Sequence, residues 1–201
     1  MQSMYPSNIE IDPPVRVARW RPLVNWILIL PLEIWMYFLS FGQFVAVAVA
    51  WFALMFTGQM PENLGNYILG VMRYDLRVGA YLFGWAEKYP GFRVHAGYVD
   101  PGNYESILYC ARPLKRRRLT VFFRGFMVFP HLIVMMILLI PLEVALFIAW
   151  FAVLIVGRWP KGLQNFSIDI LRWNYRVVTY WYLLTDVYPP FGLHPGGERR
   201  D

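Results

Sequence analysis

The stretch AWFALMFTG at Ala50–Gly58 returns as AWFAVLIVG at Ala149–Gly157, 99 residues further along the chain. Sliding the sequence by this distance without a gap aligns Arg19–Phe92 with Arg118–Phe191 and gives 22 identical residues in 74 pairs. Identical pairs occur throughout the alignment and include Pro31/Pro130, Pro61/Pro160, Asn66/Asn165, Arg73/Arg172, Arg77/Arg176, Tyr81/Tyr180 and Tyr89/Tyr188. The chain is one unit written twice, and we expect one supersecondary structure that is made twice.

The composition indicates a membrane protein. Of the 201 residues, 58% are hydrophobic and 16% are charged, whereas a typical soluble domain carries about 25% charged residues. Nine tryptophans and thirteen tyrosines suit the interfaces of a bilayer, where a ring can be half in water. A net charge of +6 on so apolar a chain favours anionic phospholipid headgroups as a partner. The basic residues form no recognition motif, so we expect no nucleic acid partner.

No motif indicates chemistry. The single cysteine, Cys110, excludes a disulfide within the chain and a thiolate metal cluster. The sequence has no G-x-S-x-G, H-E-x-x-H or Walker pattern. We therefore expect no catalytic residues, no metal and no cofactor. The N-terminus lacks the basic start of a cleavable signal, so the first apolar segment is expected to act as an uncleaved insertion signal.

Two apolar segments, 23–57 and 119–156, are too long for one straight helix that crosses a bilayer. The 34 residues from Leu23 to Phe56 contain no Lys or Arg. As one straight helix they would measure about 51 Å, whereas a bilayer core is about 30 Å thick. A tight hairpin of two short transmembrane spans fits this length best.

We expect each hairpin to turn near Ser40–Gln43 or the aligned residues, because Gly42 and Pro141 are helix breakers at matching positions. Two alternatives remain open. One is a single long helix per repeat, tilted or kinked at Pro31 and Pro130. The other is a shallow hairpin that enters and leaves the cytoplasmic leaflet.

Basic residues follow every apolar segment, and they favour the hairpins. Single spans would place the middle basic cluster outside, whereas hairpins place all clusters on one side. We expect four spans, a multi-pass topology with both termini cytoplasmic. The two repeats should then be related by an axis along the membrane normal.

A second helix should follow each hairpin, at 63–86 and at 162–185. Gly58 and Pro61 provide a helix end and a helix start, and the aligned residues do the same. Aromatic residues recur every seven positions there and arginines every four, as in an amphipathic helix lying in the interface. The fold class is therefore an all-α integral membrane protein with two tandem repeats, each a transmembrane hairpin followed by an interfacial amphipathic helix.

The expected boundaries follow from these segments. They are a polar N-terminal segment at 1–22, repeat 1 at 23–92, a basic linker at 93–118, repeat 2 at 119–191 and a C-terminal tail at 192–201.

The sequence resembles a known family. RWRPLV at Arg19–Val24, the AWFALMFTG stretch and YLLTDVYPPFGL at Tyr182–Leu193 are similar to the DUF4389 family of bacterial integral membrane proteins. The first copy departs from the pattern at Gly84–Lys88 and the second at Leu119–Phe123. The resemblance implies location in a bacterial cytoplasmic (inner) membrane and a repeat architecture, and it implies no activity.

Arginines are the first candidate site residues. Two pairs recur in both copies, and two more lie in the linker: Arg73, Arg77, Arg172, Arg176, Arg116 and Arg117. Two guanidinium groups four residues apart on a helix can converge on one lipid phosphate or on an acidic partner. The alternative is anchoring with local salt bridges, such as Asp169 with Arg172.

Three polar residues inside the apolar segments are the second set. Glu33 and Glu143 could relay protons or bind a cation, although they align with Leu132 and Phe44 and so lie outside the common unit. His131 could ligate a haem or chlorophyll, but a hydrogen bond to a neighbouring helix or headgroup is the simpler reading.

We expect a non-catalytic accessory or scaffold subunit of a larger bacterial membrane protein complex, in contact with other integral membrane subunits. The alternative is a small transporter or lipid-binding membrane protein acting as a homo-oligomer. A membrane enzyme that holds a lipid phosphate with its arginines is a weaker third hypothesis.

Overall fold

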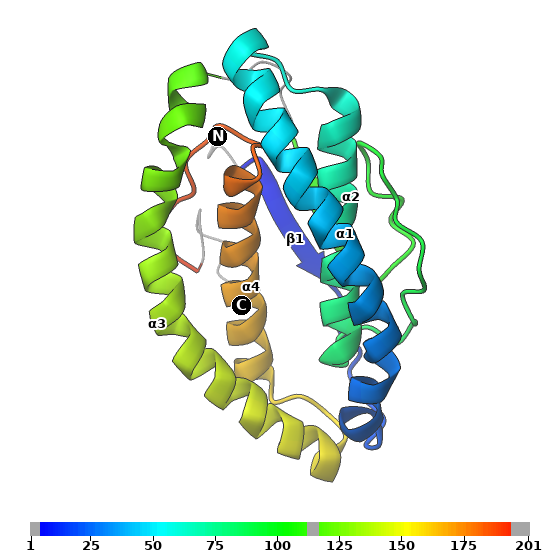
Figure 1. The fold of residues 1–201 in the computed structure, drawn as a ribbon. Coiled ribbons are helices and arrows are strands. Elements are labelled where there is room, and N and C mark those ends of the chain that lie inside the picture. The colour runs from blue at the N-terminus through cyan, green and yellow to red at the C-terminus, as the bar shows by residue number, and fades with distance from the viewer. Residues whose placement is uncertain (1–4, 112–116, 194–201) are drawn as a thin grey trace.

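The computed structural model describes residues 5–111 and 117–193. Within them the chain forms four helices and two strands (Figure 1). In chain order these are β1 Ser7–Ile11, α1 Arg21–Thr57, α2 Glu62–Leu82, β2 Ser106–Cys110, α3 Arg118–Val156 and α4 Lys161–Trp181. Each repeat is one long helix followed by one short helix, so the prediction of a supersecondary structure made twice is confirmed.

The predicted hairpins are wrong, because α1 and α3 are continuous helices of 37 and 39 residues. Gly42 is not a turn residue. A Cβ at this position would collide with the hydroxyl of Tyr67 on α2, so the glycine admits the neighbouring helix. Pro141 lies on an exposed side of α3, and the helix continues through it. Of the two alternatives, the single long helix per repeat is the one the structure has.

Glycines end both long helices. Gly58 and Gly157 adopt φ of 71° and 74° and donate their N–H groups to the carbonyls of Leu54 and Val153. This left-handed geometry costs glycine little and makes it the usual residue at a helix end. The chain then reverses, and the short helix runs back along the long one.

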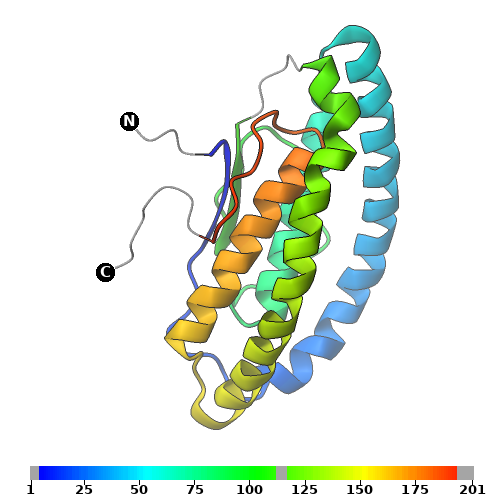
Figure 2. The ribbon, with the colours of Figure 1, turned by 90° about the vertical axis from the view of Figure 1, so that its left-hand side faces the viewer.

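Three layers build the molecule (Figure 2). The long helices α1 and α3 form the first, and α2 and α4 form the second. The third contains the strands and the loops beside them, with β2 packed on α2 and β1 on α4. The second helices were predicted correctly as helices, but they form this inner layer instead of lying free at an interface. Most of the α2 stretch from Ile68 to Tyr81 is buried.

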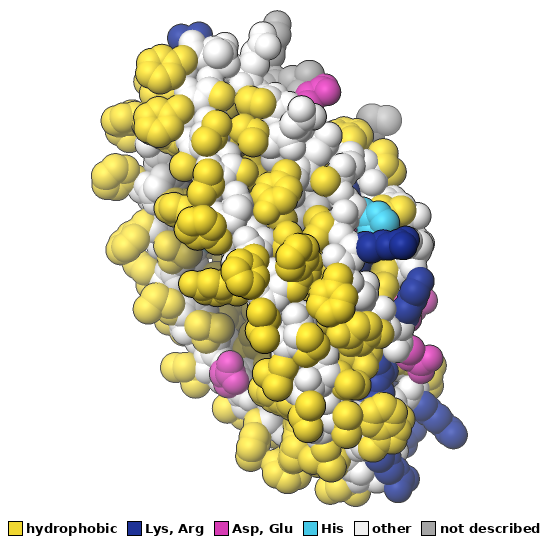
Figure 3. All heavy atoms as spheres, turned by 45° about the vertical axis from the view of Figure 1, so that its right-hand side comes forward, with side chains coloured by type: hydrophobic (Ala, Val, Ile, Leu, Met, Phe, Trp, Pro, Cys, Tyr) yellow, Lys and Arg dark blue, Asp and Glu magenta, His cyan; other side chains and the backbone are white. Residues whose placement is uncertain are grey.

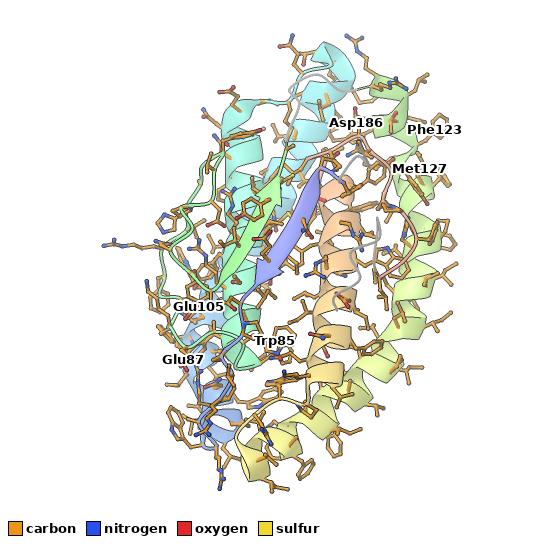
Figure 4. All side chains as sticks on the ribbon, turned by 180° about the vertical axis from the view of Figure 1, so that it is seen from behind. Trp85, Glu87, Glu105, Phe123, Met127 and Asp186 are labelled. Carbon is orange, nitrogen blue, oxygen red and sulfur yellow. The ribbon has the colours of Figure 1, made fainter. Side chains whose placement is uncertain are left out.

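The two strands correct the all-α prediction. β1 pairs with β2 in antiparallel register, with Ile9 opposite Leu108, and both side chains are fully buried. They pack into a cluster with Leu69, Met72 and Leu76 of α2. The strands cover the side of α2 and α4 that faces away from the long helices, and Figure 4 views the molecule from this side.

The two copies run in opposite directions. The N–H of Val17, just before α1, donates to Gly157 at the end of α3 with a length of 2.9 Å. The indole of Trp150 donates to the carbonyl of Pro22 at 3.0 Å. The start of α1 therefore meets the end of α3, and the approximate two-fold axis is perpendicular to the helices and passes through the layers.

In each copy, an aligned tyrosine ties the segment after the short helix to the long helix. Tyr89 donates to the carbonyl of Leu28 at 3.3 Å, and Tyr188 donates to that of Met127 at 3.0 Å. Leu28 and Met127 are aligned residues, 99 positions apart. The tyrosines recur in the sequence because each ties the segment after its short helix to its long helix.

Candidate functional site: an apolar face and a polar pocket between the repeats

The outward side of α1 and α3 is covered by exposed apolar side chains, and we call it the apolar face (Figure 3). It includes Ile34, Phe38, Phe41, Phe44, Phe52, Phe126, Phe129, Met136, Ile140 and Phe147. Phe126, for example, is 80% exposed. A continuous apolar surface of this kind is unusual for a protein surrounded by water. Among the described residues, α1 and α3 are the two helices long and apolar enough to cross a membrane.

Most exposed charged side chains lie elsewhere. Exposed acidic and basic residues occupy the strand and loop layer and include Glu10, Asp12, Glu87, Lys88 and Arg93. At the edges of the apolar face, exposed basic residues stand at the ends of the long helices: Arg16, Arg19, Arg117, Arg118, Arg158 and Lys161. In Figure 3 most charged side chains gather along one edge of the view, and hydrophobic side chains cover most of the rest. Arg116, another predicted site residue, lies outside the described residues.

The arginine pair of repeat 1 is structural. Arg73 and Arg77 are 2% and 5% exposed, and both pair with Asp100, at 3.3 and 3.0 Å. Arg73 also donates to the carbonyls of Gly97 and Tyr98. The prediction of lipid phosphate binding is wrong for this pair, because its donors are buried and used within the chain. They hold the linker against α2.

In repeat 2, Arg172 pairs with Asp169 at 2.6 Å, as the alternative of a local salt bridge predicted. Arg176 is 1% exposed and donates from Nη2 to the carbonyls of Gly192 and Leu193, at 3.0 and 3.3 Å. Burial, with repulsion from Arg172, lowers the pKa of Arg176 to about 10. These arginines also act within the chain and not on a lipid surface.

Another buried arginine was missed. Arg124 donates from Nη2 to Asp186 at 2.6 Å and from Nη1 to the carbonyl of Tyr180 at 2.5 Å. Figure 4 labels Asp186 on the segment after α4, beside α3. Asn25 is the aligned residue of repeat 1 and donates to the carbonyl of Tyr81. The sequence signal for this site was a polar residue at the same aligned position near the start of each apolar segment. It was weak because one residue is an asparagine and the other an arginine.

The intramembrane candidates have different surroundings. His131 is fully buried, and its ring stacks on Phe191 with centroids 4.0 Å apart and lies 6.0 Å from Trp173. These rings fill the space that a planar cofactor would need beside it. Glu33 and Glu143 are exposed on α1 and α3.

Glu143 lines an apolar pocket of about 500 Å³ between the start of α1 and the end of α3. Trp26, Phe83, Phe147, Trp150 and Trp159 form its walls. Among its polar residues, Arg21 donates to the carbonyl of Ala86 at 2.8 Å, and Asn25 is bonded as described above. The apolar face is hollowed in Figure 3.

A smaller, polar pocket of about 190 Å³ lies between α1, α2 and α4. We call it the central pocket; its polar lining is Ser40, Gln43, Asp75, Asn174, Tyr175 and Tyr182. Asp75 and Asn174 are aligned residues, so the pocket straddles the axis between the repeats. The strands cover the other side of α2 and α4, and the pocket lies on the side of the long helices, beside Ser40 of α1.

Asp75 is the residue that the sequence did not single out. Tyr175 donates to its Oδ2 at 2.7 Å. Its side chain is exposed at the pocket, and desolvation by the protein atoms around it raises its pKa. The hydrogen bond from Tyr175 lowers the pKa by less. The available signal was an acidic residue in the middle of a short helix between two arginines.

No three His, Cys, Asp or Glu side chains come together closely enough to hold a metal ion in residues 5–111 and 117–193.

These features define a mainly helical protein of two tandem repeats with two helices long and apolar enough to cross a membrane. The chain belongs to the DUF4389 family, a domain of unknown function whose model matches residues 19–93 and 118–192. The expected resemblance and its two tandem copies are confirmed. No curated protein and no solved structure matches the chain significantly.

Proposed function

We propose that this protein is a non-catalytic accessory or scaffold subunit of a larger bacterial membrane protein complex, held in the plane of the cytoplasmic leaflet by its apolar face. The apolar face of α1 and α3, opposite a charged layer of strands and loops, is the observation that carries the proposal. Such a two-sided slab fits the boundary between a membrane and water.

The third layer argues against helices that cross the bilayer. In a transmembrane orientation, the strands and loops beside α2 and α4 would lie at bilayer depth, because they extend along the helices (Figure 2). They carry Glu10, Asp12 and Glu105, and in the part of the chain that the structure describes no third strand joins the two-stranded sheet. Open sheet edges facing lipid do not occur in the hydrocarbon region, since their backbone groups find no partners. An in-plane orientation leaves this layer in water.

The in-plane orientation also removes the problem of length. A helix of 37 residues measures about 55 Å and need not match a bilayer core of about 30 Å when it lies flat. The basic residues before α1 and at both ends of α3 then meet headgroups of one leaflet. The two-fold axis becomes the membrane normal, as the pattern of basic residues predicted. The charged layer and both ends of the chain lie on the cytoplasmic side.

The apolar face provides the contact with other integral membrane subunits. A face that spans two long helices can cover lipid and partner helices together, and small residues such as Ala48 and Ala53 allow close approach. The described residues show no nucleophile with its base and no metal cluster, so nothing in them favours an enzyme. Among the predicted partners, anionic headgroups fit the exposed edge arginines better than the buried pairs.

A lipid-binding homo-oligomer is the second candidate, and the apolar pocket favours it. Its volume of about 500 Å³ lies within the range of about 300–1,000 Å³ that suits small amphipathic ligands. Tryptophan walls and an opening on the apolar face would suit one acyl chain.

The test is purification of the tagged protein in a gentle detergent, followed by a native gel and mass spectrometry of the bands. The proposal predicts one large band that holds several different membrane chains in a fixed ratio. A band with only this chain and lipid would contradict it and favour the homo-oligomer. Arg93→Ala, on the charged layer, is the matched control and should leave the band unchanged.

A further inference from the structure

The central pocket interrupts the apolar face with polar groups. Ser40 of α1, Asp75 of α2 and Asn174 of α4 all have accessible surface there, from three different helices. In lipid or against apolar partner helices, a polar recess of this kind needs water or a polar occupant.

The charge of the pocket is negative and unbalanced. In the part of the chain that the structure describes, Asp75 forms no ion pair with a Lys or Arg. After burial, repulsion from Asp75 is the second cause that raises the pKa of Glu33, another carboxylate. A carboxylate beside hydrocarbon is commonly paired with a positive charge from a neighbouring helix.

The other polar side chains of the central pocket all carry an oxygen that can accept a hydrogen bond. Gln43 is 5% exposed and donates from Nε2 to the carbonyl of Ile68 at 3.1 Å, which leaves its Oε1 as an acceptor at the pocket. The hydroxyl of Tyr175 is used as a donor on Asp75. An occupant that is rich in donors and carries positive charge fits this arrangement, as an ammonium or a guanidinium group does.

The volume of the central pocket limits the size of the group that it can hold. The central pocket of about 190 Å³ is smaller than the 300 Å³ or more that is typical for drug-sized ligands. One end group of a side chain fits it, whereas a lipid chain has the larger apolar pocket available. The surrounding apolar face supplies the contact area for the helix that would carry this side chain.

We propose that the central pocket receives the side chain of a Lys or Arg from an apolar helix of a partner subunit, which docks on the apolar face and pairs with Asp75. This inference rests on the proposed function and names the chemistry of the partner. In the in-plane orientation, the basic residue lies near the cytoplasmic end of a transmembrane helix of the partner, where Lys and Arg are abundant.

The experiment places a photo-crosslinking amino acid at Ser40, beside the pocket, and identifies the crosslinked peptide by mass spectrometry in membranes of the native host. The expected peptide is an apolar segment with a Lys or Arg. Asp75→Asn keeps the shape of the side chain and should reduce the yield about tenfold or more, as the loss of one partner of a desolvated charge pair does.

A matched variant separates the effect of the lost charge on the crosslink yield from an effect of a changed structure. Asp75→Asn combined with Asn174→Asp moves the carboxylate to the aligned position across the same pocket and should restore the crosslink. Tyr175→Phe removes the hydroxyl that donates to Asp75 and to the carbonyl of Met72 but keeps the carboxylate, and it should keep most of the yield. Equal yield in Asp75→Asn would overturn the inference, as would a peptide without Lys or Arg, a second copy of this chain, or lipid alone.

Failure of this inference is distinguishable from failure of the proposed function. If the native gel shows a complex but Asp75→Asn leaves both the complex and the crosslink unchanged, only the role of the central pocket is wrong. If the native gel shows no partner chain, the proposed function itself is wrong.

Discussion

Tyr175 donates a hydrogen bond of 2.7 Å to Asp75 and so joins the two repeats at the axis that relates them. The aligned residues are Leu76 and Asn174, and the bond therefore has no counterpart on the other side of the axis. The two copies therefore differ in chemistry at the point where they meet. This asymmetry makes the central pocket acidic on the side of repeat 1.

The first prediction concerns pH and the stability of the isolated protein. Burial raises the pKa of Asp75 in the folded state, so the fold is favoured when the carboxyl is neutral and loses stability as pH rises through that raised pKa. Asp75→Asn should therefore raise the Tm at neutral pH. The gain should shrink as pH falls towards the ordinary Asp value of about 4.

Thermal unfolding of both proteins in detergent, without partners, at a series of pH values measures this. Asp12→Asn, at an exposed position, is the control for loss of one charge. A gain that stays constant over the whole pH series would show that the carboxylate is not the cause.

The second prediction concerns the two aligned tyrosines. Tyr188→Phe removes a hydroxyl that bonds to Met127 at 3.0 Å from a half-buried ring. We expect a loss of about 1 kcal/mol, or roughly 2–4 °C in Tm. Tyr89→Phe should cost less, because its bond to Leu28 is 3.3 Å long and its ring is exposed. Parallel melting curves of the two variants test this, and the reverse order would contradict it.

The third prediction separates buried arginines from exposed ones. Arg77→Ala leaves Asp100 buried with one partner fewer, and removal of one member of a buried pair costs about 3–5 kcal/mol. The variant should melt much earlier or fail to fold. Asp100→Asn should also destabilise the protein, since the pair acts as a unit. Arg158→Ala, at an exposed position, should melt like the parent protein.

The fourth prediction concerns lipid binding, which should depend on the exposed arginines and not on the buried ones. Replacing Arg16, Arg19 and Arg158 by Gln removes exposed charges at one edge of the apolar face, and each basic residue near an anionic surface contributes about 1 kcal/mol. Flotation with vesicles that contain anionic lipid should show weaker binding, and high salt should reduce the difference. Binding to neutral vesicles should change little. An unchanged profile on anionic vesicles would rule out the edge arginines as headgroup contacts.

Several features of the fold could be predicted from sequence because they depend on local patterns. The repeat, the helix ends at Gly58 and Gly157, the second helices and the salt bridge of Asp169 with Arg172 need only neighbouring residues. The strand pair could not, because Ile9 and Leu108 lie far apart in the chain and each strand has only five residues.

The continuous helices could not be predicted for a different reason. Gly42 is indistinguishable from a turn residue in the sequence, and only the approach of Tyr67 from α2 explains it. The arginines were found but misassigned, since their counterion Asp100 comes from the linker, 23 residues after Arg77. Asp75 was overlooked because its place in the central pocket depends on α4, whose Asn174 and Tyr175 lie beside it.

The orientation of α1 in the membrane is the central claim, and labelling of single cysteines tests it most directly. In a Cys110→Ser background, Arg19→Cys and Gln59→Cys mark the two ends of α1 and Phe41→Cys marks its exposed middle. A membrane-impermeant thiol reagent is applied to spheroplasts and to inverted vesicles. The in-plane account predicts that both ends are labelled from the cytoplasmic side only, and the middle from neither side. Labelling of the two ends from opposite sides, or of Phe41→Cys from outside, would contradict it.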